Sequence, residues 1–399
     1  MGNDDAIVQV GEVRQKVTFD RRGRTATAAG DIVSISGLRQ GEDLVVRQLD
    51  VLQRPLGDAW QRASDWNRFH ADGSIHTRRM HLRSKLLKVV RAHFDHVGFI
   101  EVETPTLLPA PGHEVHIEPF QLAAVHGDRF LQSSPEHFMK RLLGAGFDRI
   151  FQICRCFRRE HATCTHSPEF TMLEWYRSHA SYREIMADVE RLLATVAREV
   201  TGSTRIVYQG TELELRGSWP RLSVHEAFLR YAELDLDQCD SRSAFRNRME
   251  AVGIVSGDDR DEWDDLFAKV LVERVEPALV DLGPVFLVDY PARLAALARL
   301  KPDDRNIAER VELYAGGLEL ANGYTELDDA AEQRDRFARA QETRRRSGLP
   351  EMPIDEEFLR MADAGMPPAS GIALGLDRLL MLLTDAADID QVMAFRPRP

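Results

Sequence analysis

Three runs of the sequence contain residues suited to binding a phosphorylated ligand. Arg158 and Glu160 lie two positions apart, His166 and Phe170 follow after a short polar loop, and Arg378 lies far downstream. The planar guanidinium of arginine presents paired donors that match phosphate oxygens. An Arg-x-Glu pair is too common to indicate a function by itself. The glycine patterns of Rossmann and P-loop nucleotide sites are missing, so those two folds find no support.

Acidic residues form a second group. Glu312 and Glu319 lie seven residues apart on neighbouring strand-like segments. Carboxylates placed in this way can bind a hard cation such as Mg²⁺, although isolated glutamates are more often surface residues. Glu174 is followed by two aromatic residues, and that run alone would be interpreted as the start of an amphipathic helix with its aromatic side chains in the core.

The chain has four cysteines, Cys154, Cys156, Cys164 and Cys239. They are too few and too unevenly spaced for a disulfide framework, which predicts reduced thiols. The first three lie close to two histidines and would also allow a zinc site. Because this run overlaps the one that contains Arg158, we favour buried strand cysteines beside a polar loop.

The composition is that of an ordinary globular protein, with 43% hydrophobic and 29% charged residues in 399 positions. A chain of this length predicts two to three domains, or one large domain with an appendage. The net charge of −12 means that a polyanion such as tRNA would need a local basic patch. No apolar run reaches the roughly 18 residues of a membrane span, and the first residues do not resemble a signal peptide. We therefore expect a cytoplasmic protein.

Two domains are predicted, over 1–75 and 76–399. Residues 31–36 and 44–51 are β-like runs joined by a turn at 37–42, and 52–75 is a connecting segment without a sustained period. In the second domain the apolar spacing predicts a helix over 82–97 that ends at Gly98, and a strand that Pro105 stops.

Further elements predicted in the second domain have periods of either 3.6 or two residues. The predicted helices cover about 181–199, a charged and solvated stretch at 328–348 that includes Arg344, Arg345 and Arg346, and 376–383. The predicted strands cover 130–132 and 150–153 in the central sheet, then 311–314, 319–321 and 371–375. Strand pairs with long intervening segments favour an antiparallel α+β domain over βαβ repeats.

In their order and spacing, Pro105, the runs around Arg158 and His166, and the run Gly375–Arg378 resemble the three signature motifs of class II aminoacyl-tRNA synthetases. Four longer runs resemble the lysyl branch, namely Ser134–Arg141, His166–Tyr176, Glu319–Leu327 and Ser370–Gly375. They are most similar to the EpmA, GenX or PoxA family, whose members ligate (R)-β-lysine to a lysine of elongation factor P. The resemblance covers about residues 76–399. It implies an antiparallel sheet flanked by helices, preceded here by a truncated OB-like β unit.

The resemblance also implies how ATP and Mg²⁺ would bind. Arg158 would contact the α-phosphate and the substrate carboxylate, and Arg378 would hold the γ-phosphate. Glu160 would accept from the adenine amino group, Phe170 would stack on the base, and His166 would lie near the phosphates. The resemblance further assigns Mg²⁺ to Glu312 and Glu319, and Gly375 to the nucleotide site. Activation of a carboxylate by ATP needs positioning and cationic groups more than acid–base chemistry, which agrees with these residue types.

For the amino-acid substrate, the resemblance assigns Glu136 to the backbone-side amine. The side-chain ammonium would lie among Glu174, Tyr176 and Glu326, with Asn322 near the carboxylate. Two further residues match the paralogue better than the synthetase: Ala373, where the synthetase usually has glycine, and Ser134, where it has alanine. A pocket this rich in glutamate favours lysine-like dications over neutral amino acids.

Three departures concern the second substrate. Residues 1–75 are too short for a complete five-stranded OB-fold that reads tRNA, yet the familiar members of the family begin almost at the catalytic domain. Thr165 and Ser167 stand where the synthetase has arginine and asparagine, in the loop that would meet the acceptor.

The resemblance therefore implies a homodimeric, ATP-dependent ligase that activates lysine or (R)-β-lysine and transfers it to elongation factor P. The dimer would form through the helix and strand that precede Pro105. One alternative is a lysyl-tRNA synthetase-like enzyme that charges tRNA or supplies activated lysine to another acceptor. A second alternative is an inactive paralogue that acts as a binding module, and its mark would be loss of the ATP arginines or metal glutamates, which are all present.

Overall fold

In the computed structural model, side chains are described for residues 69, 75–112, 117–123, 127–255, 258 and 261–396, and the backbone also for four N-terminal strands. By its internal contacts the chain separates into two units, residues 1–81 and 82–399. Each unit is described by itself. The segment 54–68, which belongs to the predicted connection, lies outside the described residues.

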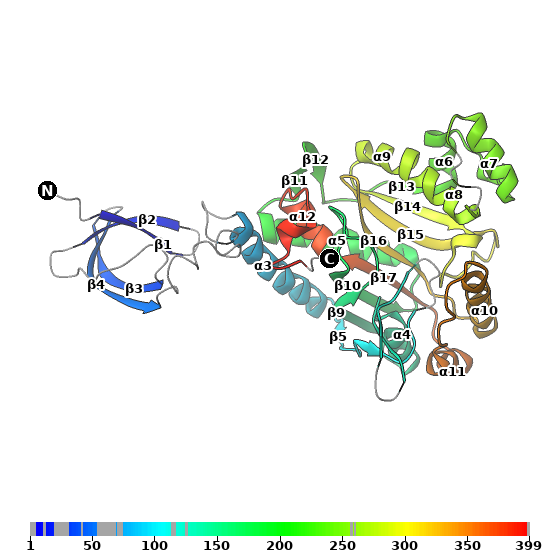
Figure 1. Cartoon of the computed structure of the whole chain (residues 1–399), viewed down its shortest axis with the longest axis horizontal. Helices are drawn as coiled ribbons and strands as arrows, with labels where there is room; N and C mark the ends of the chain where they lie inside the picture. Colours follow the sequence, from blue (N-terminus) through cyan, green and yellow to red (C-terminus); the bar gives the residue numbers. More distant parts are fainter. Residues whose placement is uncertain are drawn as a thin grey trace. The chain divides into compact units, whose positions relative to one another are not determined.

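The N-terminal unit contains a four-stranded sheet in the order β1-β2-β4-β3 (Figure 1). Its strands are β1 Asp5–Val10, β2 Val13–Phe19, β3 Ile32–Gln40 and β4 Asp43–Gln53. The sequence predicted only the last two strands. The predicted turn at 37–42 was too long, because β3 continues through it to Gln40 with an irregularity in its pairing at Ser36/Gly37.

An eight-stranded sheet forms the centre of the second unit, in the order β13-β14-β15-β16-β17-β10-β9-β5 (Figure 1). It is antiparallel except for the pairs β13–β14 and β5–β9. Its strands are β5 Ile100–Glu101, β9 Arg149–Phe157, β10 Glu169–Ser178, β13 Arg221–Ser223, β14 Val285–Pro291, β15 Ile307–Ala315, β16 Leu318–Thr325 and β17 Ala369–Gly375. This is the predicted α+β class.

Three helices cover one face of this sheet: α3 Ile75–His96, α5 Tyr182–Thr201 and α12 Leu376–Leu383. Their apolar stripes pack on alternate strand residues such as Trp175 and Leu374, both fully buried, and form the main core. A serine capping box begins α5 and Gly202 in the left-handed conformation ends it, as expected for a helix with local start and stop signals. Burial of this face leaves the opposite face of the sheet for the polar residues.

Among the described residues, helical segments cover the two ends of the opposite face. A helical segment packs against β14 with a separate apolar core, and it comprises α6 Val224–Ala232, α7 Arg242–Ala251, α8 Trp263–Val270, a π-helical turn Leu271–Val275 and α9 Glu276–Leu279. At the other end α4 Glu136–Gly144 packs on Ile150 and Tyr176. The middle of this face, which we call the active face, carries the candidate site.

The remaining elements are small or peripheral. They include the sheet of β6 Leu107–Leu108, β7 Gln121–Leu122 and β8 Arg129–Leu131, the hairpin of β11 Arg205–Tyr208 and β12 Thr211–Glu214, and the helices α10 Ala330–Arg346 and α11 Glu356–Ala364. Short 3-10 turns cover Leu236–Gln238, Val280–Leu282, Ala292–Leu294 and Ile389–Val392.

Three predictions about these elements were wrong in detail. Residues 130–132 belong to the small sheet through β8 and not to the central one. The strand before Pro105 is only Ile100–Glu101. In α10, Arg344 is buried and donates from Nε to the Pro350 carbonyl, whereas the predicted helix was solvated throughout.

Candidate active site

One row of side chains crosses the middle of the active face. Glu312 on β15 lies opposite Asn322 on β16, which lies opposite Ala373 on β17. Ala373 in turn lies opposite Glu174 on β10, and Glu174 opposite Gln152 on β9. Directly opposed residues in an antiparallel sheet have Cβ atoms about 4.5–5.5 Å apart. Strand pairing therefore brings four predicted site residues side by side from distant parts of the chain.

The adjacent row of opposed strand residues explains why position 371 is a glycine. Gly371 on β17 lies between Tyr324 and Tyr176. A Cβ atom at Gly371 would lie 2.2 Å from the Tyr176 ring and 2.8 Å from Oε1 of Glu326. Only glycine allows these two side chains to come this close.

Five polar side chains meet at the end of the active face nearest α4, and we call this cluster the amine pocket: Ser134, Glu136, Lys140, Glu174 and Glu326. The Glu174 carboxylate accepts from Ser134 Oγ at 2.9 Å and from the Tyr176 hydroxyl at 2.5 Å. The Lys140 ammonium lies 2.6 Å from Oε1 of Glu136 and 2.5 Å from Oε2 of Glu326. Glu174, Glu326 and Lys140 are each about 1% exposed.

The protonation of the amine pocket follows from its charges. Burial raises the pKa of Glu174 to about 8, and the nearby charge of Glu136 adds to this. Burial also raises the pKa of Glu326 to about 8, although Lys140 opposes the shift. Burial disfavours ionisation of Glu136 as well, but the Lys140 charge holds the pKa of that carboxyl below its usual value. Three carboxyl groups thus share one ammonium, and the pocket would carry two excess negative charges if all three were ionised.

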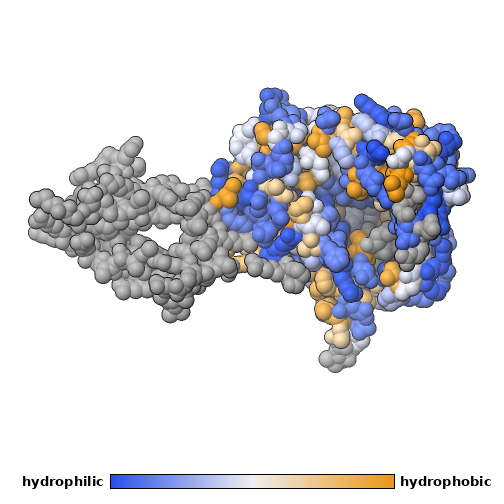
Figure 2. All heavy atoms as spheres, turned by 45° about the horizontal axis from the view of Figure 1, so that its top comes forward, coloured by the Kyte–Doolittle hydropathy of each residue, from blue (hydrophilic) through white to orange (hydrophobic). Residues whose placement is uncertain are grey.

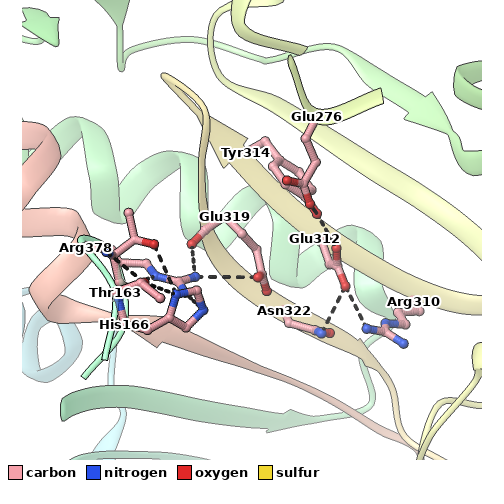
Figure 3. A network of polar contacts seen from close by, with 10 residues as sticks. Thr163, His166, Glu276, Arg310, Glu312, Tyr314, Glu319, Asn322 and Arg378 are labelled. Atoms are coloured by element: carbon pink, nitrogen blue, oxygen red, sulfur yellow. Dashed lines mark hydrogen bonds and ion pairs between the residues drawn. The ribbon is translucent and has the colours of Figure 1, made fainter. Parts of the chain in front are cut away.

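On the side of the row away from the amine pocket, Arg378 holds two segments together (Figure 3). Its Nη1 donates to the Glu319 carbonyl at 2.8 Å and lies 3.5 Å from the Glu319 carboxylate. Its Nη2 lies 2.7 Å from Nε2 of His166, and its Nε donates to the Thr165 carbonyl. Arg378 lies in the first turn of α12, which directly follows β17. The strand-to-helix turn at Gly375 therefore directs its side chain toward the loop between β9 and β10.

His166 is a neutral acceptor in this arrangement. Burial lowers the pKa of its imidazole to about 4, and Arg378 and Arg158 add to the effect. Because Arg378 donates to Nε2, the ring proton is on Nδ1, which lies 3.0 Å from Thr163 Oγ1. The histidine therefore fixes the loop and the arginine relative to each other without adding charge.

Arg158 directly follows the last residue of β9 and lies beside the other predicted ATP residues. Its guanidinium lies over the Phe170 ring, 5.2 Å from the ring centre. Burial raises the pKa of Glu160, against the charges of Arg158 and Arg378. The buried Nε of Arg158 has no hydrogen-bond partner among the described residues. An unpaired buried donor beside an aromatic ring fits a ligand that brings an anionic oxygen and a planar base.

The two predicted metal carboxylates lie on adjacent strands (Figure 3). Glu312 accepts from Arg310 at 2.7 Å, from Asn322 at 3.2 Å and from the Tyr314 hydroxyl at 2.8 Å. Burial raises the pKa of Glu319, and the charge of Glu312 adds to it. The buried Oδ1 of Asn322 has no hydrogen-bond partner among the described residues. An all-oxygen set with mutually repelling carboxylates fits Mg²⁺, which would neutralise phosphate charge there.

Four residues of the site were missed by the sequence analysis: Lys140, Tyr324, Arg310 and Glu276. Lys140 lies four positions after Glu136 on α4, and such residues meet on one helix face, but the sequence analysis did not predict this helix. Arg310 lies two positions before Glu312, hence on the same face of β15. Glu276, whose carboxylate accepts from Tyr314 at 3.3 Å, comes from the helical segment and gave no signal.

Two other sequence interpretations can be compared with the geometry. A Cβ atom at Gly375 would make only ordinary contacts at 3.9 Å, so packing does not require glycine there. The Cys154 and Cys156 sulfurs lie 3.8 Å apart. Among the described residues, one group of three possible metal ligands lies close together, namely the partly buried His225 and Asp235 with the exposed Asp237. It contains none of the cysteines.

A largely antiparallel sheet with one arginine in the first turn of its last helix, a second arginine directly after β9 and carboxylates on two neighbouring strands defines a catalytic domain of the class II synthetase type. Residues 70–398 match the family described as tRNA synthetases class II (D, K and N). The chain belongs to this family. In the part of the chain that the structure describes, no helix combines the length and apolar character needed to cross a bilayer.

Two kinds of relative are similar to the chain. A lysine–tRNA ligase of Magnetococcus marinus is 36% identical over 386 residues, which cover 92% of this chain and 76% of the relative. An elongation factor P–(R)-β-lysine ligase of Erwinia tasmaniensis is 39% identical over 320 residues, which cover 78% of this chain and 93% of the relative. A ligase of the latter name from Edwardsiella ictaluri is 38% identical over the same length. The similarity to the tRNA ligase thus extends over more of the chain.

Proposed function

We propose that this protein uses ATP and Mg²⁺ to activate lysine or (R)-β-lysine as an aminoacyl-adenylate and then transfers the aminoacyl group to a lysine of elongation factor P. The observation that carries the proposal is the amine pocket, where three buried carboxyls share the single ammonium of Lys140. A substrate with two ammonium groups supplies the missing charges.

Activation needs the substrate carboxylate held in line with the α-phosphorus. Arg158 would contact the substrate carboxylate and the α-phosphate, with its unpaired Nε as one of the donors. Arg378 would hold the distal phosphates. Mg²⁺ held by Glu312 and Glu319 would neutralise charge that develops on pyrophosphate. The His166 side chain keeps Arg378 and its loop in place, and being neutral it does not repel the two arginines.

The amine pocket explains the choice of amino acid. Oε1 of Glu326 is buried without a hydrogen-bond partner among the described residues, and such an acceptor is costly unless a ligand donates to it. Glu136 is the first residue of α4, and we assign the backbone-side amine of the substrate to it. We expect norleucine, which lacks the side-chain ammonium, and 6-aminohexanoate, which lacks the backbone amine, to be activated at least about 100-fold less well than lysine.

Ala373 bears on the choice between the two lysine isomers. Its methyl group lies between Asn322 and Glu174 in the row that crosses the active face. A methyl group there shortens the space between the carboxylate end and the amine end of a substrate, and the β-amine shifts the amine toward the side-chain end. We expect Ala373→Gly to shift the preference toward lysine, measured as the ratio of kcat/KM for the two isomers in pyrophosphate exchange.

The alternative acceptor is tRNA, and one observation favours it. Alignment with the tRNA ligase covers 92% of the chain, which takes it into the N-terminal unit, whereas alignment with the elongation factor P ligase covers 78%. The described N-terminal strands number four, against the five of a complete OB-fold. Since either acceptor takes part in translation, we place the activity in the cytoplasm.

One experiment separates the acceptors. The full-length protein is incubated with ATP, Mg²⁺ and labelled lysine or (R)-β-lysine, together with total tRNA and unmodified elongation factor P. Label that resists ribonuclease and raises the mass of the factor supports the proposal. Label that ribonuclease destroys would replace it with the tRNA-charging function, and no pyrophosphate exchange with either isomer would reject activation of a lysine altogether.

A further inference from the structure

Lys140 lies inside the amine pocket, and the proposed activation of a lysine does not by itself give this residue a role. It is on the second turn of α4, four positions after Glu136 in the first turn. Its side chain is 1% exposed, so water cannot screen its charge. Burial of an unpaired ammonium is very costly, and both of its carboxylate partners belong to the pocket.

Lys140 contacts one carboxylate oxygen of each of its two partners, Glu136 and Glu326. On Glu136, the same oxygen, Oε1, accepts from the Lys140 ammonium and from the Tyr324 hydroxyl. On Glu326, Oε2 faces Lys140 at 2.5 Å, while Oε1 has no hydrogen-bond partner among the described residues. One oxygen of each carboxylate is therefore used by the protein, and the other remains for a ligand.

The surroundings of Lys140 hold it in this bridging position. Its ammonium lies 5.2 Å from the centre of the Tyr324 ring, a favourable cation–π distance. The apolar residues Met139 and Leu143 of the same helix are buried against β9 and β10, which fixes the helix to the sheet. A compact ammonium that reaches two carboxylates at once serves this position better than a planar guanidinium.

We propose that Lys140 is a positioning residue that sets how many ammonium groups the amine pocket accepts and where they bind. It neutralises one of three buried carboxylates and orients Glu136 and Glu326, so that a substrate must bring two ammonium groups, each to a defined oxygen. The inference rests on the proposed activation of a diamino acid and goes beyond it by naming the residue that sets the count.

The test is pyrophosphate exchange with lysine and (R)-β-lysine by full-length variants. Lys140→Met keeps the volume and removes the charge, and we expect KM for the better isomer to rise at least about 10-fold, with kcat and KM for ATP within about threefold of the parent. Lys140→Ala lacks a propylammonium fragment, so we expect added n-propylamine to lower its KM for the substrate, whereas n-propanol has no effect. The matched control is Lys301→Met, since Lys301 pairs with Asp289 at 2.7 Å and contacts none of the pocket carboxylates.

The outcomes separate the two proposals. If the parent exchanges with neither isomer, the proposed function fails. If the parent is active and Lys140→Met keeps the parent KM, or if folded Lys140→Ala does not respond to propylamine, the role of Lys140 is rejected. Thermal unfolding shows which variants are folded, and Lys140→Gln replaces any variant that is not, with the same rise in KM expected.

Discussion

At the residue scale, the site consists of two charged ends joined by one row of side chains. Arg158 and Arg378 supply fixed positive charge at the end predicted to bind ATP, while the glutamates of the amine pocket supply negative charge at the other. The two arginines and the pocket glutamates each have the charge opposite to that of the substrate group proposed for them. This matching of charges gives two predictions that can be tested on single residues.

The first prediction concerns the arginines. Arg378→Ala or Arg158→Ala should lower kcat for pyrophosphate exchange by about 10²–10³ or more, because each removes a fixed donor from the reacting phosphate groups. The control is Arg191→Ala, which changes an arginine paired with Asp188 on α5, on the covered face of the sheet. Near-normal exchange by either active-face variant would contradict the site assignment.

The second prediction concerns pH. The ionised forms of Glu174 and Glu326 bind ammonium, and their pKa values of about 8 mean that both hold protons at pH 7. KM for the amino acid should therefore fall as pH rises from 6.5 to 8.5, and binding at pH 7 should release protons, which calorimetry in buffers of different ionisation enthalpy measures. Glu174→Gln should weaken both effects, and an unchanged proton release would contradict the assignment.

The raised pKa values of these two carboxyls also affect the stability of the free protein. Rising pH favours substrate binding but lowers the stability of the folded state. A carboxyl whose pKa is raised from 4.5 to about 8 by folding stabilises the folded state below pH 4.5, and this contribution is lost as pH rises through 8. The thermal midpoint of free Glu174→Gln should therefore exceed that of the parent at pH 8.5, and the difference should shrink toward pH 5. A constant difference across that range would show that the carboxyl is not titrating in the folded protein.

At the scale of elements, the strands supply the site and the helices supply its walls. Gly371 shows how closely β17 is fitted to its neighbours. Gly371→Ala should raise KM for lysine and lower stability by about 1–3 kcal/mol, because the new methyl group overlaps the Tyr176 ring. Gly112→Ala is the matched control, since its Cβ atom would meet Ser133 Oγ at an ordinary 3.6 Å. Equal KM values in the two variants would contradict this reading of Gly371.

Local signals explain which elements could be predicted. The helices at 181–199 and 376–383 carry their own apolar stripes, and the structure confirms both helices. The partner of a strand is not written in its own residues, which is why β8 was assigned to the wrong sheet. For the same reason the row from Glu312 to Gln152 could not be derived, since it depends on pairing among five strands.

At the scale of the whole molecule, the outer edge of the catalytic sheet carries exposed apolar residues. Ile100 on the edge strand β5 is 53% exposed, and Leu107, Leu122 and Phe147 are also exposed. Figure 2 shows apolar residues gathered on the projection at the lower edge of this unit. An open edge strand with apolar neighbours is a surface that a second chain can cover, and we propose that the homodimer forms there.

Dimerisation can be tested by substitution at this edge. Ile100→Asp combined with Leu107→Asp should convert a dimer to a monomer, measured by light scattering on the eluted protein, because burial of two charges opposes the interface. Leu229→Asp together with Val272→Asp is the control pair, since both residues are exposed on the helical segment at the other end of the sheet. A parent that is monomeric at micromolar concentration would reject the proposed dimer.

The position of β17 has a consequence for how the protein is made. Residues 369–375 pair with β16 on one side and β10 on the other, at the centre of the sheet and next to the row of site residues. While a ribosome is still adding these residues, the strands already synthesised belong to two separate halves of the sheet, and each half carries only part of the site. The central pairing joins segments almost 200 positions apart, and contacts of such long range slow folding. We therefore expect catalytic competence to appear abruptly and late in synthesis, when the last strand closes the sheet.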